Sequence, residues 1–145
     1  MRIAIVSGFF NPLHGGHLDM IEAAAALGDR LIVIVNNDLQ QMLKKDQVIL
    51  DEDNRARLLG ALRFVDEVRI AEDTDPTVVQ SLKRIRDDHP DDELIFANGG
   101  DRDSDLVTPE AEICETTNIT MAYGVGGTSK ADSSTRINQA LGHDR

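Results

Sequence analysis

The 145-residue chain has one cysteine, no tryptophan and no apolar run long enough to span a membrane. Because Cys114 has no second cysteine to pair with, an internal disulfide is excluded. The absence of a recognisable signal peptide or long apolar segment predicts a cytoplasmic protein without a membrane partner. Aromatic residues make up only 3% of the chain, so few rings could stack on a flavin. This argues against a flavodoxin-like binder of a flavin phosphate.

Positive charge is also scarce in this sequence. Fifteen Lys and Arg residues stand against 26 Asp and Glu residues, which leaves a formal net charge of −11. Nucleic acids and anionic membranes are bound through broad basic surfaces, so both are excluded as general partners. A protein this acidic must gather local positive charge if it is to hold a polyphosphate. Lys and Arg residues near glycine-rich segments are therefore the candidates for binding a polyphosphate.

Short apolar runs alternate with segments of helical periodicity along the whole chain. The runs predict strands at residues 2–6, 31–35, 67–71, 93–97 and 119–123. Helices are expected at about residues 18–28, 51–65, 76–89, 108–117 and 132–142, with a loop after the second strand. We predict a single α/β domain over residues 1–145, a Rossmann-like doubly wound sheet of five parallel strands in the order 3-2-1-4-5. Its ligand would bind at the carboxyl ends of the strands, between strands one and four.

The segment from Gly8 to His17 joins the first predicted strand to the first predicted helix. A helix N-terminus has free backbone N–H groups and the positive end of the dipole, so it attracts phosphates. His14 and His17, three residues apart, would add ring N–H donors on one side of this turn. Two other interpretations remain open: the histidines could only cap and pack the turn, or they could bind zinc. Zinc is less well supported, because neither an acidic residue in the segment nor a second cysteine would complete its ligands.

Three segments of the chain resemble the cytidylyltransferase-like family of small nucleotidyltransferases. Its motif G-x-F-[DN]-x-x-H-x-G-H is matched by Gly8, Phe10, Asn11, His14, Gly16 and His17. Residues 55–68 are similar to a helix-and-strand segment of the glycerol-phosphate and choline-phosphate cytidylyltransferases, and residues 133–137 to the Ser/Thr-rich loop of the family. The glycerol-phosphate branch is the nearest in pattern.

This resemblance implies a transfer of a nucleoside monophosphate from a nucleoside triphosphate, with magnesium, to a small phosphorylated acceptor. His14 and His17 would then stabilise charge on the reacting phosphate, and Lys44 or its neighbour Lys45 would contact phosphates. Lys44 and Lys45 could instead be a solvated pair. Further nucleotide contacts are implied at Gly8, Phe9, Phe10, Asn11, Gly16 and Arg55. Dimerisation is common in the family, so a homodimer is expected.

The second half of the predicted site comes from two later segments. Asp101, after the fourth predicted strand, could orient a ribose hydroxyl or a magnesium ion. Ser133, Ser134 and Thr135 would hold the β- and γ-phosphates, unless they only cap the last helix. Arg136 would add charge at the same place, or lie on the surface.

The nucleobase does not follow from these motifs. Residues 63–68 favour CTP, whereas Asn11-Pro12 and the lack of an arginine before the Ser/Thr loop favour ATP. We expect CMP transfer with release of pyrophosphate. The alternative is an adenylyltransferase that acts on a phosphorylated sugar, vitamin or cofactor precursor. A nucleotide-binding module without turnover is a third hypothesis, against which the two histidines argue.

Overall fold

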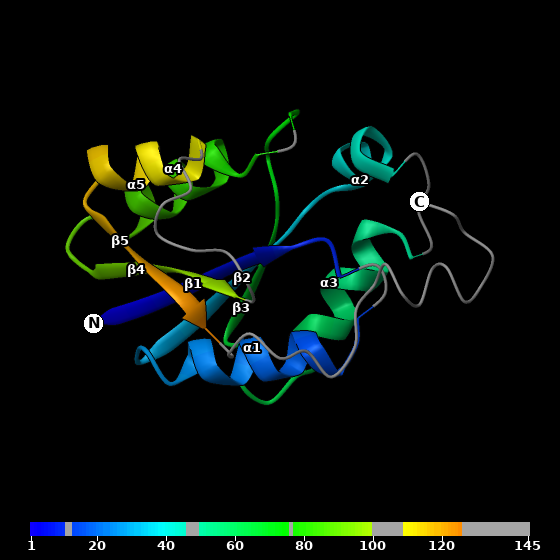
Figure 1. Ribbon diagram of the computed structural model, residues 1–145, viewed down its shortest axis with the longest axis horizontal. Coiled ribbons are helices and arrows are strands. Elements are labelled where there is room, and N and C mark those ends of the chain that lie inside the picture. The colour runs from blue at the N-terminus through cyan, green and yellow to red at the C-terminus, as the bar shows by residue number, and fades with distance from the viewer. Residues whose placement is uncertain (11–12, 46–49, 76, 100–108, 126–145) are drawn as a thin grey trace.

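Five parallel strands form one sheet in the computed structural model, which describes residues 1–10, 13–45, 50–75, 77–99 and 109–125. The strands are β1 (Arg2–Gly8), β2 (Arg30–Val35), β3 (Glu67–Ile70), β4 (Glu93–Gly99) and β5 (Ile119–Val125). Their order is β3-β2-β1-β4-β5 (Figure 1), which confirms the predicted fold. The order reverses between β1 and β4, where ligands of such sheets bind.

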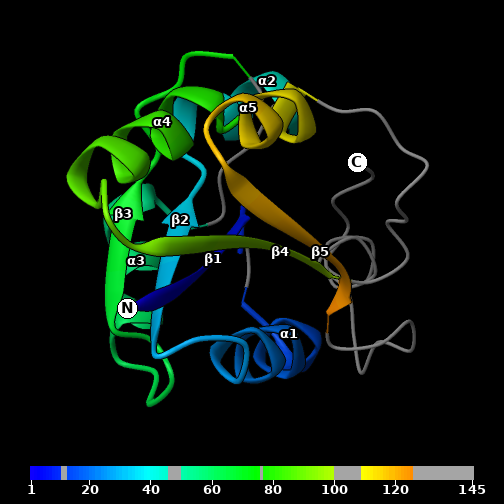
Figure 2. The ribbon, with the colours of Figure 1, turned by 90° about the vertical axis from the view of Figure 1, so that its left-hand side faces the viewer.

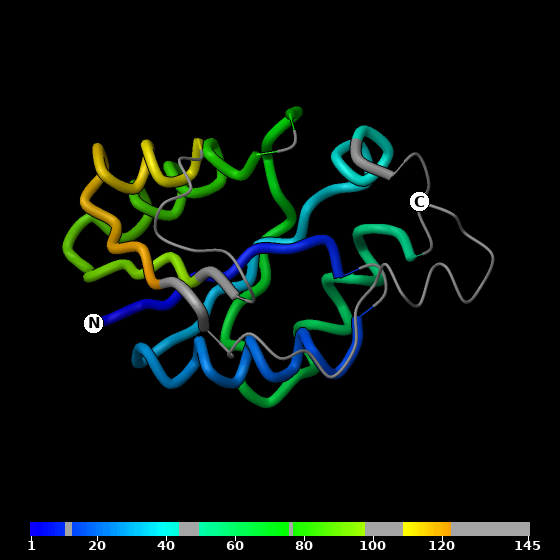
Figure 3. The backbone as a smooth tube through the Cα atoms, viewed as in Figure 1, coloured from blue at the N-terminus to red at the C-terminus, as the bar shows by residue number. Residues whose placement is uncertain are grey.

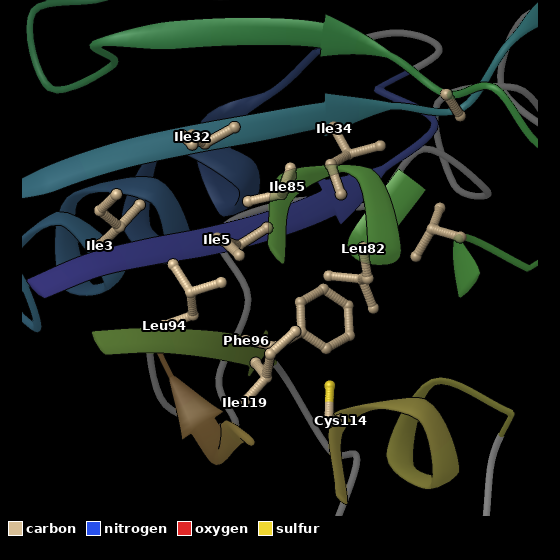
Figure 4. Packing of buried hydrophobic residues seen from close by; sticks show 12 residues of the cluster. Ile3, Ile5, Ile32, Ile34, Leu82, Ile85, Leu94, Phe96, Cys114 and Ile119 are labelled. Atoms are coloured by element: carbon tan, nitrogen blue, oxygen red, sulfur yellow. The ribbon is translucent and has the colours of Figure 1, made fainter. Parts of the chain in front are cut away.

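Both faces of the sheet are buried at its centre, because β1, β2 and β4 are apolar at every position of their cores, whereas the edge strand β3 includes Glu67 and Arg69 and is half-buried. Ile3, Ile5, Ile32 and Ile34 point to one face and pack against α4 (Val79–Asp88) and α5 (Pro109–Thr116) (Figure 4). The alternate strand positions pack on the other face against α1 (Gly15–Ala25) and α3 (Glu52–Gly60). Figure 2 shows α1 opposite α4 and α5 across the sheet.

These four helices confirm predicted ones, with different ends. The prediction that Asp75 and Pro76 begin α4 is wrong, because the N-cap position is Val78 and its side chain makes no capping bond. The carboxylate of Asp73 does the capping instead, accepting hydrogen bonds from the backbone N–H groups of Gln80 (2.8 Å) and Ser81 (3.1 Å). The predicted helix at 132–142 lies outside the described residues. Within the described segments no helix has both the length and the apolar character needed to cross a bilayer.

The loop predicted after β2 is a helix, α2 (Asp38–Lys45). It begins with a reciprocal pair of hydrogen bonds: the side chain of Asn37 accepts from the N–H of Gln40, and the side chain of Gln40 accepts from the N–H of Asn37. The Glu52 carboxylate accepts from the N–H of Asp38, at the positive end of α2. Polar residues thus begin this helix. Helices are usually predicted from apolar residues at helical spacing that face the core.

Candidate functional site

The segment after β1 turns sharply at the carboxyl edge of the sheet. The chain crosses the middle of the molecule in β1 and returns along α1 (Figure 3). Phe10 has a positive φ of 51° and is 2% exposed, because its ring folds back over the end of the strand. A Cβ atom on Gly8 would lie 2.9 Å from that ring. Glycine is therefore required at position 8 for packing.

His14 begins α1 as its N-cap residue. Its Nδ1 accepts a hydrogen bond from the N–H of Gly16 at 3.0 Å, and its own N–H donates to Nδ1 of His17 at 3.2 Å. This is a capping box built from two histidines, where Ser or Thr with Glu or Gln is usual. The interpretation of the two histidines as caps is thus confirmed for their Nδ1 atoms.

The two imidazole rings lie against each other. Their centroids are 3.8 Å apart with planes at 24°, and Phe10 meets the ring of His17 edge to face at 4.9 Å. Because Nδ1 of each ring accepts a backbone hydrogen bond, the ring hydrogen of each neutral histidine is on Nε2. The capping arrangement therefore fixes two N–H donors side by side at the positive end of α1. Two such donors could stabilise a bound anion whose negative charge increases during a reaction.

Arg55 on α3 has a buried guanidinium that binds protein groups. Nη1 donates to the carbonyl oxygens of Phe9 and Asn36, both at 2.7 Å, and Nε donates to that of Leu50 at 2.8 Å. Nη2 forms a 2.7 Å ion pair with Asp38. The side chain is fully buried and ties the histidine segment, the end of β2 and α2 together. The predicted contact of Arg55 with a nucleotide stays a prediction, whereas its positioning role is directly visible.

Both lysine positions of α2 adjoin the buried face of the helix by register. Position 44 follows the buried Gln40 by four residues, and position 45 follows the buried Gln41 by four residues. The register therefore does not decide between Lys44 and Lys45 as the phosphate contact, which remains a prediction.

The remaining predicted site residues divide into two groups. Phe9 presents its carbonyl oxygen to Arg55, and Gly16 lies in the first turn of α1. Outside the described residues lie Asn11, Asp101, Ser133, Ser134, Thr135 and Arg136. Within the described segments, no group of three or more His, Cys, Asp or Glu side chains could hold a metal ion.

Sequence reasoning missed a buried amide network at the end of β2. Oε1 of Gln40 accepts from Nδ2 of Asn36 at 3.1 Å and from the N–H of Asn37 at 2.9 Å. Its Nε2 donates to the carbonyl oxygens of Asp75 (2.7 Å) and Thr77 (2.8 Å). Gln40 thus fixes the connection between β3 and α4 against α2. The signal was present, because Asn37-x-x-Gln40 is a capping-box pattern.

Residues 63–68, which suggest CTP, lie at the other end of the sheet. The Asp66 carboxylate accepts from the N–H of Leu31 at 2.8 Å, and Glu67 begins β3. Leu31 precedes Asn36, at the carboxyl end of β2, by five residues, or about 16 Å of strand. This segment is therefore remote from His14 and His17 in the same chain.

Comparisons with known proteins agree with this architecture. A family model described as Cytidylyltransferase-like matches residues 5–140. The bifunctional protein HldE of Koribacter versatilis is 35% identical over 102 residues, which cover 69% of this chain and 19% of that protein. The FAD synthase of Thermococcus kodakarensis is 42% identical over 86 residues, which cover 58% of this chain and 56% of that protein. The chain thus spans about a fifth of that HldE and just over half of that FAD synthase.

One solved structure is similar along nearly its whole length. It is the lipopolysaccharide core biosynthesis protein from Thermoplasma volcanium, with a TM-score of 0.64 and 27% sequence identity. The similarity covers 91% of this chain and 99% of that chain. The sheet and its surrounding helices are therefore shared with a protein of similar size.

Proposed function

The chain belongs to the cytidylyltransferase-like family, and from this premise we propose that it is a nucleotidyltransferase. It transfers a nucleoside monophosphate from a nucleoside triphosphate to a small phosphorylated acceptor. A phosphate oxygen of the acceptor attacks the α-phosphorus, the bond from that phosphorus to the bridging oxygen breaks, and pyrophosphate leaves with the bonding electrons. Because the acceptor phosphate is anionic at neutral pH, the reaction needs no general base.

The observation that carries this proposal is the paired histidine donors at the start of α1. Their Nδ1 atoms are occupied by backbone N–H groups, which leaves the hydrogen of each ring on Nε2. In the transition state negative charge grows on the oxygens around the α-phosphorus, and fixed donors stabilise that charge more than they stabilise the substrate. The histidines are thus suited to catalysis by charge stabilisation.

The strand order suggests where each substrate lies. The nucleotide occupies the reversal between β1 and β4, with its phosphates over α1. Asp101 and the Ser133 to Arg136 segment are proposed to complete this nucleotide site. Magnesium enters as part of the nucleotide substrate, bound to its phosphate oxygens. The acceptor lies on the opposite side of the histidines, over the ends of β2 and β3.

We favour ATP over CTP as the nucleotide. The Thermococcus kodakarensis relative is named for FAD, a dinucleotide with an adenylyl half. The segment that suggests CTP, residues 63–68, is engaged at the amino edge of the sheet. CTP remains the second candidate, because the same segment resembles the cytidylyltransferase branch.

A pyrophosphate-release screen tests the reaction. Four nucleoside triphosphates with magnesium are each combined with a panel of phosphorylated polyols, sugars and vitamins, with the His17→Ala variant as the control. Pyrophosphate release that needs both substrates, and that the variant lacks, supports the proposal. Nucleotide binding without pyrophosphate from any pair would contradict it and favour the module without turnover.

Competition between nucleotides tests the base. ATP and CTP at equal concentration are supplied with the acceptor found in the screen, and the product is identified by mass. Because a buried hydrogen-bonding group left unpaired costs about 1–3 kcal/mol, we expect the preferred base to dominate by at least tenfold. Predominant cytidylyl product would overturn the choice of ATP and leave the reaction class standing.

A further inference from the structure

Phe10 has a strained backbone at the start of the histidine segment, residues 8–17. Its φ of 51° lies in the left-handed region, which a bulky aromatic residue rarely adopts. Glycine would adopt this conformation at a lower cost. The glycine of this turn is instead Gly8, whose own φ lies outside that region. Because strained residues gather at functional sites, the ring of Phe10 is the feature of this position that needs an explanation.

The ring of Phe10 is anchored in the core. It is 2% exposed and packs in the cluster between the sheet and helices α1 and α3. Arg55 holds the carbonyl oxygen of the preceding residue, Phe9, at 2.7 Å. On the strand side the ring lies against Gly8, where an added Cβ atom would be 2.9 Å from Cζ of the ring. Phe10 therefore has little freedom to move in the folded protein.

The imidazole of His17 contacts two aromatic rings. It meets Phe10 edge to face at 4.9 Å, with the planes at 67°, and stacks on His14 at 3.8 Å. Its Nδ1 also accepts the backbone hydrogen bond from His14. A hydrogen bond to one ring nitrogen holds that atom, but it leaves the plane of the ring able to turn. The aromatic contacts limit this turning, and so they determine where the Nε2–H bond points.

The three rings differ in how firmly the protein holds them. Phe10 is a core residue, whereas His14 and His17 are only half-buried. Stacking fixes the two imidazoles relative to each other, but a stacked pair can still tilt as one unit. The edge of the Phe10 ring connects this pair to the core, because it contacts His17 directly. Phe10 is thus a fixed support against which the histidine pair rests.

We propose that Phe10 is a positioning residue, whose ring holds the imidazole of His17, and through it that of His14, in the orientation that the reaction needs. This inference rests on the proposed function. The family resemblance implies a nucleotide contact at Phe10, but a ring that is 2% exposed acts on the nucleotide through the two histidines. A donor that meets a phosphate oxygen in the transition state tolerates little displacement, since an error of about 1 Å can cost about 10²-fold in rate.

The first test uses Phe10→Leu with Phe96→Leu as the matched control. Both phenylalanines are 2% exposed, but Phe96 packs on the other face of the sheet (Figure 4). Each substitution removes a buried ring, so both should lower Tm. We expect only Phe10→Leu to lower kcat, by about 10- to 10²-fold with little change in the KM for the nucleotide, because the donors act in the transition state. An equal fall in kcat in Phe96→Leu would overturn the inference.

Gly8→Ala displaces the same ring without removing it. The added methyl group would lie 2.9 Å from Cζ of Phe10, so the ring must shift. Gly60→Ala is the control, because a Cβ atom there would lie 3.7 Å from the side chain of Val68, which is an ordinary contact. We expect Gly8→Ala to lower kcat as Phe10→Leu does, and Gly60→Ala to keep it. Full kcat in folded Gly8→Ala would contradict the positioning role.

Nitrogen NMR of the histidine rings tests the same role without substrate. With histidine labelled at its ring nitrogens, the spectrum shows which nitrogen carries the hydrogen, and His17→Ala identifies the signals of His17. We expect Phe10→Leu to shift these signals and to leave those of His89, which is bonded to Asp92 at the amino edge of the sheet, unchanged.

The spectrum and the pyrophosphate screen fail separately. Unchanged His17 signals in Phe10→Leu would overturn the positioning role and leave the proposed function standing. Shifted signals in Phe10→Leu, with no pyrophosphate release by the parent protein, would overturn the proposed function and leave the contact of Phe10 as the support of His17.

Discussion

Each ring of the histidine pair has two nitrogens with separate tasks. Nδ1 belongs to the helix cap, since it accepts a backbone hydrogen bond in both residues. Nε2 carries the hydrogen and is the donor that the proposed reaction uses. A substitution can therefore remove one task and keep the other.

His14→Asn should keep the cap and lose the catalytic donor. Asparagine is a good N-cap whose side-chain oxygen can replace Nδ1, but its side chain is too short to put a donor where Nε2 lies. We expect turnover to fall by about 10²-fold or more with little change in Tm. His14→Ala should lose both tasks and also about 1 kcal/mol of stability. Pyrophosphate release and thermal unfolding measure the two effects, and full turnover in His14→Asn would remove His14 from the mechanism.

Cys114 should be inert in the folded protein. It is fully buried against the sheet, and this burial, with the charge of Glu110, raises the pKa of its thiol to about 12. At pH 8 almost no thiolate is present, and the thiolate is the reactive form. We expect no labelling by a maleimide in native buffer and complete labelling in denaturant. Rapid native labelling would mean that α5 opens readily.

At the scale of elements, the sequence predicts the helices and strands whose buried positions are apolar. The central strands β1, β2 and β4 are runs such as Ile3 to Val6 that are buried on both faces, so their positions follow directly, whereas β3 is half-buried and includes Glu67 and Arg69. Helix α2 was missed because its buried positions are glutamines and its apolar side chains face outward. The start of α4 was predicted wrongly, because the carboxylate that caps it belongs to Asp73, five residues before the N-cap position.

The candidate site was predictable to a different degree. The histidine segment matches a motif of six residues within ten positions, so His14 and His17 could be predicted from the sequence alone. Arg55 was expected to contact the nucleotide because the resemblance to the family implies it. Its partners include the carbonyl oxygens of Phe9 and Asn36, which are distant in the sequence, and no local pattern encodes such contacts.

The capping of α4 gives a prediction with an internal control. Asp73→Ala removes a buried carboxylate that accepts two backbone hydrogen bonds and one from the Ser81 hydroxyl. The free energy of unfolding should fall by about 1–3 kcal/mol in urea titrations. Asp75→Ala should have a smaller effect, because the Asp75 carboxylate is exposed and accepts hydrogen bonds from Thr77, two residues later. Equal effects of the two substitutions would contradict the assignment of the cap.

Arg55 gives a prediction about positioning. Arg55→Lys keeps the charge but cannot span the four acceptors, so it should lower the free energy of unfolding by about 3 kcal/mol. Asp38→Asn, which removes only the ion pair, is the control and should be milder. If Arg55→Lys instead raises the KM for nucleotide at unchanged stability, Arg55 is mainly a nucleotide contact.

At the scale of the whole molecule, the two edges of the sheet differ in character. The carboxyl edge holds the histidine segment. The amino edge has an open pocket lined in part by Asp87, Asp91, Asp92 and Glu93. Asp92 and Glu93 are paired there with the N-terminal ammonium group and with Arg2. With a net charge of −11, the protein nevertheless repels itself overall.

Salt should therefore stabilise the protein. Screening of repulsion by 0.5 M NaCl, which shortens the Debye length to about 4–5 Å, should raise Tm. Each kcal/mol of repulsion removed corresponds to about 2–4 °C for a chain of this size. KCl should act equally, because the effect is one of ionic strength. A fall in Tm with salt would show that surface ion pairs such as Arg69 with Asp88 outweigh the repulsion.

The central place of β1 also determines the order in which the chain can fold. Its first residues are made first, yet Arg2 pairs with Glu93, 91 residues later. During synthesis β1 can add β2 and β3 on one side, while its other edge waits for β4 to leave the ribosome. Closing so long a loop before its contacts form slows folding, and an apolar edge left open is prone to aggregation. Expression at reduced temperature or with chaperones should accordingly favour the soluble protein.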